Sequence, residues 1–128
     1  MIDASILANV VGDDAMGGRR ARGEVRDAED IAAPDLIDVE TVAVLHKRWL
    51  AGTISDERFA TAIAYLEASP LEHYPTLPLM RRAYDLRGNL TPYDATYIGL
   101  AEAIGCVLVT SDRRLAGAPG LLCEVKVL

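Results

Sequence analysis

The sequence predicts an α/β domain in which short, mainly parallel strands alternate with helices. Short apolar runs are separated by longer segments in which apolar residues recur at helical spacing. The chain has 128 residues, of which 51% are hydrophobic and 25% charged, so we expect residues 1–128 to form a single globular domain. Strands separated by helices pair in parallel, which predicts a doubly wound sheet with helices on both faces.

The first half of the chain is expected to alternate between strand and helix from its first residues. Met1–Ala4 is apolar enough for a strand, which is expected to be short because only two residues precede Asp3. The next elements are expected in this order: a short helix over Ser5–Val11 that stops at Gly12, a helix that Asp13 or Asp14 caps and that runs to about Ala28, a strand over Ile31–Ala33 before Pro34, an apolar helix over Leu36–Leu50 that stops at Ala51-Gly52, a helix that Ser55 caps and that ends near Ala68, and a strand over Leu71–Tyr74 between two prolines.

The second half is expected to continue the same alternation. Leu77–Leu86 is amphipathic and is expected to be helical up to Gly88-Asn89. Thr91 followed by Pro92 is a typical helix start, and Gly105 is a typical helix end. Cys106–Val109 is a continuous apolar run of the kind found in buried parallel strands, and Cys123–Leu128 is expected to be the last strand.

Composition excludes several classes of function. The formal charge is −6, which argues against a protein that coats nucleic acid through bulk positive charge. Two cysteines and two widely separated histidines provide neither a disulfide framework nor a zinc site. The sequence shows no signal peptide and no apolar stretch near the roughly 20 residues of a membrane span, so we expect a cytoplasmic protein.

Two aspartates follow predicted strands. In open α/β sheets, ligands bind outside the carboxyl ends of the strands. Asp3 follows the first predicted strand, and Asp112 follows the Cys106–Val109 strand across Thr110-Ser111. Either one alone is also explained by ordinary loop capping.

Two further acids lie on predicted helices. Glu40 has apolar neighbours on its helix face, where an uncompensated carboxylate costs free energy. Asp94 shares a face with Tyr97 and Ile98, although an acid in a first helical turn is also stabilised by the helix dipole.

Together, these four acids indicate a metal site. No lysine is near any of them in the sequence, and clustered carboxylates need a cation to hold them together. A hard divalent ion such as Mg²⁺ takes oxygen ligands and leaves room for water and phosphate. Ser5 and Thr110 add hydroxyl groups beside the acids. The residues therefore predict metal-dependent phosphoryl transfer.

Other acid-based sites fit less well. An adhesion-type Asp-x-Ser-x-Ser site is broken by Leu7, and a haloacid-dehalogenase site needs an acid where Ser5 stands. A receiver domain needs a lysine by its acidic pocket, and neither lysine is suitably placed in the sequence. No P-loop or Gly-rich dinucleotide motif is present.

The same residues resemble a known family. Asp3-Ala4-Ser5, Glu40 in an apolar helix, Tyr93-Asp94-Ala95-Thr96-Tyr97 and Thr110-Ser111-Asp112 resemble the motifs of the PIN domain, and the length and layout resemble the VapC-type toxins of bacterial type II toxin–antitoxin modules. The resemblance implies a three-layer α/β/α sandwich with a central, mostly parallel sheet. It also implies a Mg²⁺- or Mn²⁺-dependent endoribonuclease whose catalytic and metal-binding residues are Asp3, Glu40, Asp94 and Asp112, supported by Ser5 and Thr110.

A mechanism and partners follow from this resemblance. One or two metal ions would activate a water that attacks phosphorus, leaving 5′-phosphate and 3′-hydroxyl ends. A small antitoxin would cover the acidic site, and an arginine from it would pair with the carboxylates. The family also implies a homodimer, with Trp49, Phe59 and Ile63 as candidate interface residues, although a place in the chain's own core is the favoured alternative for each. The competing hypothesis is a catalytically weak PIN-like domain that binds RNA or protein.

RNA still has to reach an acidic site. Arg19, Arg22 and Arg26 have the i, i+3, i+7 spacing of one helical stripe, and Arg113 is next to Asp112. The alternative is a solvated face with local ion pairs, such as Arg20 with Glu24. Without the four site acids, 15 acidic residues face 13 basic ones, so the net charge outside the site is only −2.

Overall fold

All pairing between strands is parallel in the computed structural model, which describes residues 1–26, 28 and 30–128. Strand β1 (Ile31–Pro34) pairs with β2 (Leu71–Tyr74), and β3 (Leu108–Thr110) pairs with β4 (Val125–Val127). Helices separate the two strands of each pair, as parallel connections require. The predicted α/β class with parallel strands is confirmed. Among the described residues, the strands form two separate hydrogen-bonded pairs.

The expected first strand is reduced to a single bridge. Ile2 is paired in parallel with Val109, and the adjacent backbone hydrogen bonds join Val109 N to Met1 O and Asp3 N to Val109 O. Helix α1 (Ala4–Gly12) begins directly afterwards, because the Asp3 carboxylate accepts the backbone N–H of Ile6 as an N-cap. Asp3 therefore lies where an extended segment beside β3 turns into a helix.

Most helices begin and end where local signals predict. Ser55 accepts the N–H of Arg58, Thr91 accepts that of Asp94, and Gly105 ends its helix with a φ of 67°. Two details were not predicted: Leu77–Leu86 splits into η1 and α5, and a short helix follows Asp112. The helices are α2 (Met16–Arg26), α3 (Ile37–Leu50), α4 (Asp56–Glu67), the 3₁₀ turn η1 (Leu77–Leu79), α5 (Met80–Asp85), α6 (Pro92–Ile104) and α7 (Arg113–Ala116).

The second helix also begins near its predicted cap. The Asp13 carboxylate accepts the N–H groups of Ala15 and Gly18. The expected continuation to about Ala28 crosses residue 27, which lies outside the described residues.

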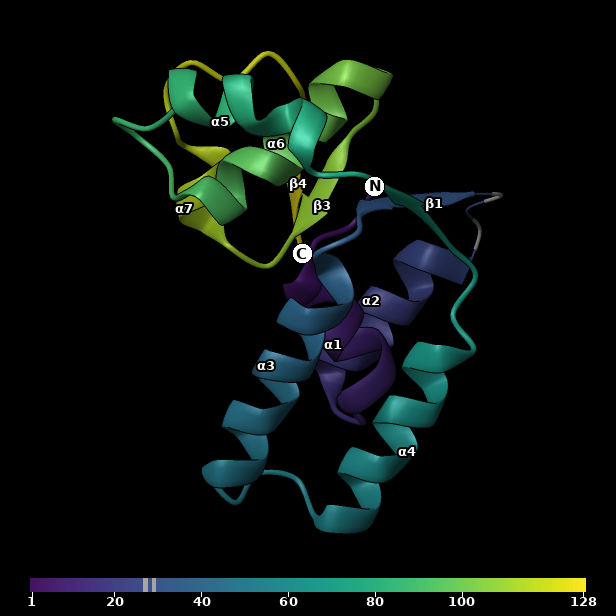
Figure 1. The fold of residues 1–128 in the computed structure, drawn as a ribbon. Coiled ribbons are helices and arrows are strands. Elements are labelled where there is room, and N and C mark those ends of the chain that lie inside the picture. Colours follow the sequence, from purple (N-terminus) through teal and green to yellow (C-terminus); the bar gives the residue numbers. More distant parts are fainter. Residues whose placement is uncertain (27, 29) are drawn as a thin grey trace.

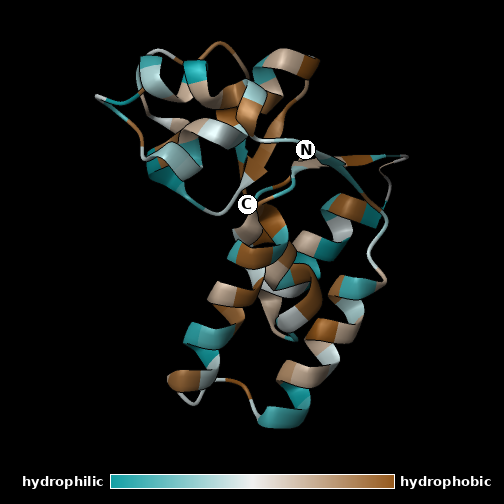
Figure 2. Cartoon of the chain, viewed as in Figure 1, coloured by the Kyte–Doolittle hydropathy of each residue, from teal (hydrophilic) through white to brown (hydrophobic). Residues whose placement is uncertain are grey.

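The helices form two groups joined by the core. Figure 1 shows α1 to α4 together at one end of the molecule and α5 to α7 around β3 and β4 at the other. Buried side chains from both groups, including Ile6, Leu45, Ile98 and Leu108, belong to one hydrophobic core. Hydrophobic residues are accordingly concentrated in α1 and β3, whereas the start of α4 is hydrophilic (Figure 2). No helix in the described part of the chain is long and apolar enough to cross a bilayer.

Candidate active site

Asp3 is a buried carboxylate held by two hydroxyl groups. Its Oδ1 accepts hydrogen bonds from Ser5 Oγ at 2.6 Å and Ile6 N at 3.1 Å, and its Oδ2 accepts one from Thr110 Oγ1 at 2.5 Å. Only 8% of the residue is exposed. Burial raises the pKa of Asp3, while the hydrogen bonds from Ser5 and Thr110 act in the opposite direction. Both predicted supporting residues therefore contact the first acid directly.

The same two hydroxyl groups also accept hydrogen bonds from the loop after β3. Ser5 Oγ accepts the N–H of Ser111 at 3.0 Å, and Thr110 Oγ1 accepts the N–H of Asp112 at 2.9 Å. A hydroxyl group donates one hydrogen bond and accepts others, so each links Asp3 to this loop. The bridge between Ile2 and Val109 thus brings together two acids that are 109 positions apart in the sequence.

Glu40 on α3 is held by a tyrosine from α6. The Tyr97 hydroxyl donates to Glu40 Oε2 at 2.7 Å, and Tyr97 is only 3% exposed. Burial raises the pKa of Glu40, and the charges of Asp94 and Asp3 raise it further. Burial and the Glu40 carboxylate raise the pKa of Tyr97 as well, so the phenol remains a neutral donor. No sequence signal predicts this pair, because the two helices meet only in the folded chain.

The other two acids lie at helix starts. Asp94 is in the first turn of α6, where its Oδ2 accepts the Thr91 hydroxyl at 3.0 Å. Asp112 caps α7 and also forms an ion pair with Arg114, whose Nη2 lies 2.9 Å from Asp112 Oδ2. The hydrogen bonds from Arg114 lower the pKa of Asp112.

All four predicted acids line one pocket of about 350 Å³, here called the acidic pocket. Thr110 does not line this pocket, but its hydroxyl group donates a hydrogen bond to Asp3, which does. The expectation that no lysine is near the acids is wrong, because Lys47 also lines this pocket. Lys47 is seven residues after Glu40, which places both on one face of α3. The lining residues are Asp3, Ala4, Ser5, Glu40, Ala43, Val44, Lys47, Asp94, Tyr97 and Asp112.

The donor types of the acidic pocket suit a hard divalent cation. Carboxylate and hydroxyl oxygens are ligands for Mg²⁺ or Mn²⁺, and no cysteine or histidine lines the pocket. Burial disfavours the ionised forms of Asp3 and Glu40, and a bound cation would offset that cost. Within residues 1–26, 28 and 30–128, however, no three acidic, histidine or cysteine side chains are already close enough to hold one ion. The chemistry fits, whereas the side chains in this conformation do not form a coordination shell.

The predicted arginine stripe lies outside the acidic pocket. Arg22 is partly buried, and its Nη1 donates to the backbone oxygens of Val10 and Asp13 at the end of α1. Arg19 and Arg26 are exposed on the same helix. None of these three arginines lines the acidic pocket. Arg113 is exposed beside Asp112. Glu24, the expected partner of Arg20, accepts two hydrogen bonds from Lys126.

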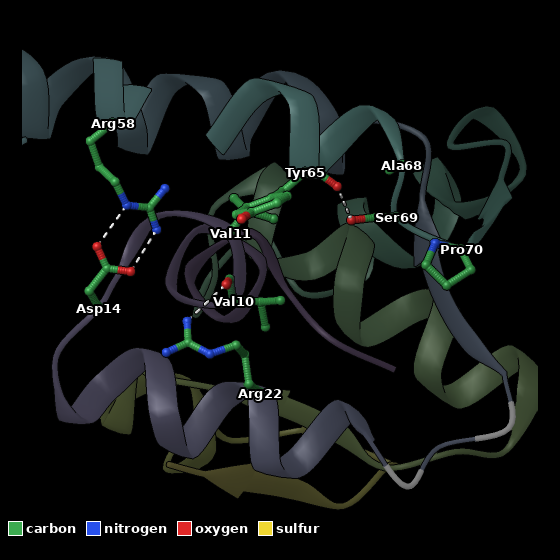
Figure 3. Close-up of a pocket in the computed structure, with 9 residues that line it drawn as sticks. All are labelled: Val10, Val11, Asp14, Arg22, Arg58, Tyr65, Ala68, Ser69 and Pro70. Atoms are coloured by element: carbon green, nitrogen blue, oxygen red, sulfur yellow. Dashed lines mark hydrogen bonds and ion pairs between the residues drawn. The ribbon is translucent and has the colours of Figure 1, made fainter. Parts of the chain in front are cut away.

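Arg22 belongs to a second pocket, of about 560 Å³, between α1, α2 and α4 (Figure 3). We call it the arginine pocket. Arg58 donates to both carboxylate oxygens of Asp14, at 2.8 and 3.0 Å. The residues that line the arginine pocket are Val10, Val11, Asp14, Arg22, Arg58, Tyr65, Ala68, Ser69 and Pro70.

The candidate interface residues differ in how deeply they are buried. Phe59 and Ile63 are partly buried and pack against the core, whereas Trp49 is 39% exposed. Together they line an apolar pocket of about 350 Å³ between α3 and α4. The Trp49 indole donates to Asp56 Oδ1 at its edge.

Comparisons with known proteins identify the family of this chain. Residues 1–121 match the PIN domain family. Ribonuclease VapC1 of Mycobacterium tuberculosis is 38% identical over 121 residues, which are 90% of each chain. Ribonuclease VapC12 of the same organism is 33% identical over 110 residues, which are 86% of this chain and 81% of the relative.

Solved structures have the same fold. PAE2754 from Pyrobaculum aerophilum superposes with a TM-score of 0.71 and 28% identity, over 98% of this chain and 81% of that one. VapC20 of M. tuberculosis, a toxin that cleaves the sarcin-ricin loop, also has a TM-score of 0.71, with 14% identity over 94% of this chain and 95% of that one. The match over nearly the whole chain shows that this protein belongs to the PIN domain family, as a VapC-type member.

Proposed function

We propose that this protein is a divalent-metal-dependent endoribonuclease and the toxin of a toxin–antitoxin pair, with residues 1–128 acting as one domain. The observation that carries this proposal is the acidic pocket. Four carboxylates from four separate segments of the chain line it, and among the described residues only Asp112 forms an ion pair with a cation of the chain itself. Together with the likeness to the VapC ribonucleases, this charge arrangement favours a nuclease over a structural role.

The proposed roles follow from the contacts of each residue. Asp3, Glu40, Asp94 and Asp112 would hold Mg²⁺ or Mn²⁺, which would lower the pKa of a bound water and offset charge on the phosphate. Ser5 and Thr110 hold the Asp3 carboxylate in place, and Tyr97 orients Glu40. Water, rather than the 2′-hydroxyl of RNA, would attack phosphorus and the P–O3′ bond would break, so the products would carry a 5′-phosphate and a 3′-hydroxyl.

The RNA contacts proposed from the sequence divide into two groups. Arg113 is exposed next to Asp112 and is therefore our first candidate for a phosphate contact. Arg19 and Arg26 remain candidates on the exposed side of α2. Arg22 is a weaker candidate than Arg113, because two backbone oxygens already accept hydrogen bonds from its Nη1.

We also propose the partners expected from the family. A small antitoxin would cover the acidic pocket and place an arginine against its carboxylates. VapBC2 from Rickettsia felis, whose structure was solved with promoter DNA, has the same fold with a TM-score of 0.66 and 15% identity over 98% of this chain and 96% of that one. The apolar pocket around Trp49 is the proposed contact of a homodimer, and the cytoplasm is the proposed compartment.

The test is cleavage of RNA by the purified full chain. We expect cleavage with Mg²⁺ or Mn²⁺, none with EDTA, and a loss of at least about 100-fold for Asp94→Asn, because ligand loss costs at least as much as loss of a residue that orients a ligand. Asp85→Asn, an exposed acid at the end of α5, is the matched control. Cleavage that persists with EDTA or in Asp94→Asn would contradict the proposal.

A second candidate function is a PIN-like module that binds RNA or protein without cutting. One observation favours it: no ligand cluster is preformed among the described residues, and Arg114 already occupies Asp112. This alternative predicts RNA binding that is independent of divalent ions and equal in Asp94→Asn and wild type.

A further inference from the structure

Lys47 places a positive charge on the wall of the acidic pocket. On α3, the residues at i, i+3, i+4 and i+7 from Glu40 all line the pocket: Glu40, Ala43, Val44 and Lys47. Seven residues of helix span about 10 Å, so the backbone of Lys47 lies roughly two turns beyond that of Glu40. The lysine is thus attached well to one side of the carboxylates.

The Lys47 ammonium group has no bound partner in the described part of the chain. It is exposed, and no hydrogen bond or ion pair joins it to any described residue, although it lines a pocket with four acids. Lys126 differs, because both carboxylate oxygens of Glu24 accept hydrogen bonds from it at 2.7 and 2.8 Å. Lys47 therefore keeps all three of its donors for a ligand.

The surface between Glu40 and Lys47 is apolar. Ala43 is exposed and Val44 is half-buried there. A single RNA strand alternates charged phosphates with less polar nucleosides, and proteins that bind such strands combine backbone-tracking cations with apolar or aromatic contacts. The order acid, apolar surface, lysine along this face of α3 matches that alternation.

We propose that Lys47 binds the phosphate next to the one that is cleaved, so that the RNA strand follows α3. This inference rests on the proposed nuclease function. With the scissile phosphate at the four acids, the adjoining nucleoside lies over Ala43 and Val44, and the next phosphate reaches the ammonium group. Lys47 is then a positioning residue, because it holds the strand and does not touch the reacting atoms.

The competing role for Lys47 is electrostatic. A free ammonium group beside four carboxylates lowers their mutual repulsion, whether or not RNA is present. That role predicts a change in divalent-ion affinity when the charge is removed. The phosphate role predicts a change in RNA affinity and in its salt dependence.

The experiment compares Lys47→Gln and Lys47→Arg with wild type on single-stranded RNA oligonucleotides. For Lys47→Gln, we expect KM to rise about 3- to 10-fold with kcat within about twofold. The slope of log(kcat/KM) against log salt should become shallower by about 0.7, the value for one lost phosphate contact on a single strand. Lys47→Arg should remain close to wild type. Lys126→Gln, which removes the other lysine away from the acidic pocket, should leave both parameters unchanged.

Two further measurements separate the possible failures. RNA binding is measured by fluorescence anisotropy in the Asp94→Asn background, with and without Lys47→Gln, and Mn²⁺ binding is measured by calorimetry. Unchanged KM, anisotropy and salt slope in Lys47→Gln would overturn the inference, as would a change confined to Mn²⁺ affinity. If wild type does not cleave RNA at all, the nuclease proposal fails, while the anisotropy still decides whether Lys47 contacts the strand.

Discussion

The two ends of α1 carry acids in opposite electrostatic settings. At its start, Asp3 is buried in the acidic pocket with hydroxyl partners, and burial raises its pKa. Just beyond its end, Asp14 lies in the arginine pocket, where the Arg58 guanidinium binds both of its oxygens and lowers its pKa. Both residues are aspartates near the same helix, but Asp3 is buried without a cationic partner among the described residues, whereas Asp14 is exposed and paired with a guanidinium group.

This contrast separates structural from functional carboxylates. An acid whose cation comes from the chain itself completes an internal ion pair and has no need of a ligand. A group of acids without such a cation costs free energy in the folded protein, and this cost marks candidate sites. Asp112 is intermediate, because it lines the acidic pocket and yet pairs with an exposed arginine.

The largest expected effect is the difference in activity between variants of the two aspartates, Asp3 and Asp14. Asp3→Asn should lower kcat/KM for RNA by at least about 100-fold, because it removes the most rigidly held ligand charge. Asparagine still caps a helix, so the variant should fold. Asp14→Asn is the matched control and should stay within about twofold of wild type. Equal losses of kcat/KM in the two variants would contradict the assignment of the acidic pocket as the catalytic site.

An intermediate effect concerns stability without metal. Burial raises the pKa of Glu40 above its ordinary value, so the folded state binds more protons than the unfolded state between the two pKa values. Ionised Glu40 therefore destabilises the fold at pH 7, and this cost disappears as the pH falls through its folded pKa. Glu40→Gln should raise the urea midpoint at pH 7 in EDTA, since glutamine can still accept the Tyr97 hydrogen bond.

The pH dependence is the control for this prediction. The gain from Glu40→Gln should shrink toward pH 4, where the wild-type side chain is also neutral. Asp112 has the opposite sign: its lowered pKa gives a contribution to stability that is present above its unfolded pKa and is lost as the pH falls through the folded value. A gain that grows toward acid pH would contradict the raised pKa of Glu40.

The smallest expected effect sharpens the intermediate case. Arg114→Ala should tighten Mn²⁺ binding about two- to fivefold in calorimetry, because an exposed ion pair is worth up to about 1 kcal/mol and competes with the metal for Asp112. Arg113→Ala removes the neighbouring charge without that ion pair and should change the affinity less. If the two variants change the Mn²⁺ affinity equally, the effect comes from the loss of one positive charge near the pocket and not from the ion pair between Arg114 and Asp112.

The local parts of the fold could be predicted because their signals lie within a few residues. Ser55 and Thr91 cap helices through hydrogen bonds to residues three positions ahead, and Gly105 has the positive φ that a helix end favours. The first strand was the least accurate prediction. Its backbone pairs with β3 through one bridge between Ile2 and Val109, and Asp3 caps a helix immediately afterwards.

The candidate site was predicted in part. Acids at strand ends and on apolar helix faces stand out in the sequence, and the fold places all four in one pocket. The contacts that distinguish them join residues far apart in the chain, as with Tyr97 and Glu40, and carry no local signal. Arg22 has contacts that helical spacing does not reveal, because its guanidinium donates to the backbone oxygens of Val10 and Asp13, and its RNA contact stays a prediction.

The sequence by itself determined the parallel α/β class and the starts of most helices, and it singled out the four acids that the fold brings to one pocket. Only the tertiary structure decided that Asp14 pairs with Arg58, 44 positions away, and that Lys47 lines the acidic pocket without an ion-pair partner among the described residues. Helix caps depend on backbone geometry within one turn. Charge pairing depends on which surfaces pack together, and packing is decided by the whole hydrophobic core.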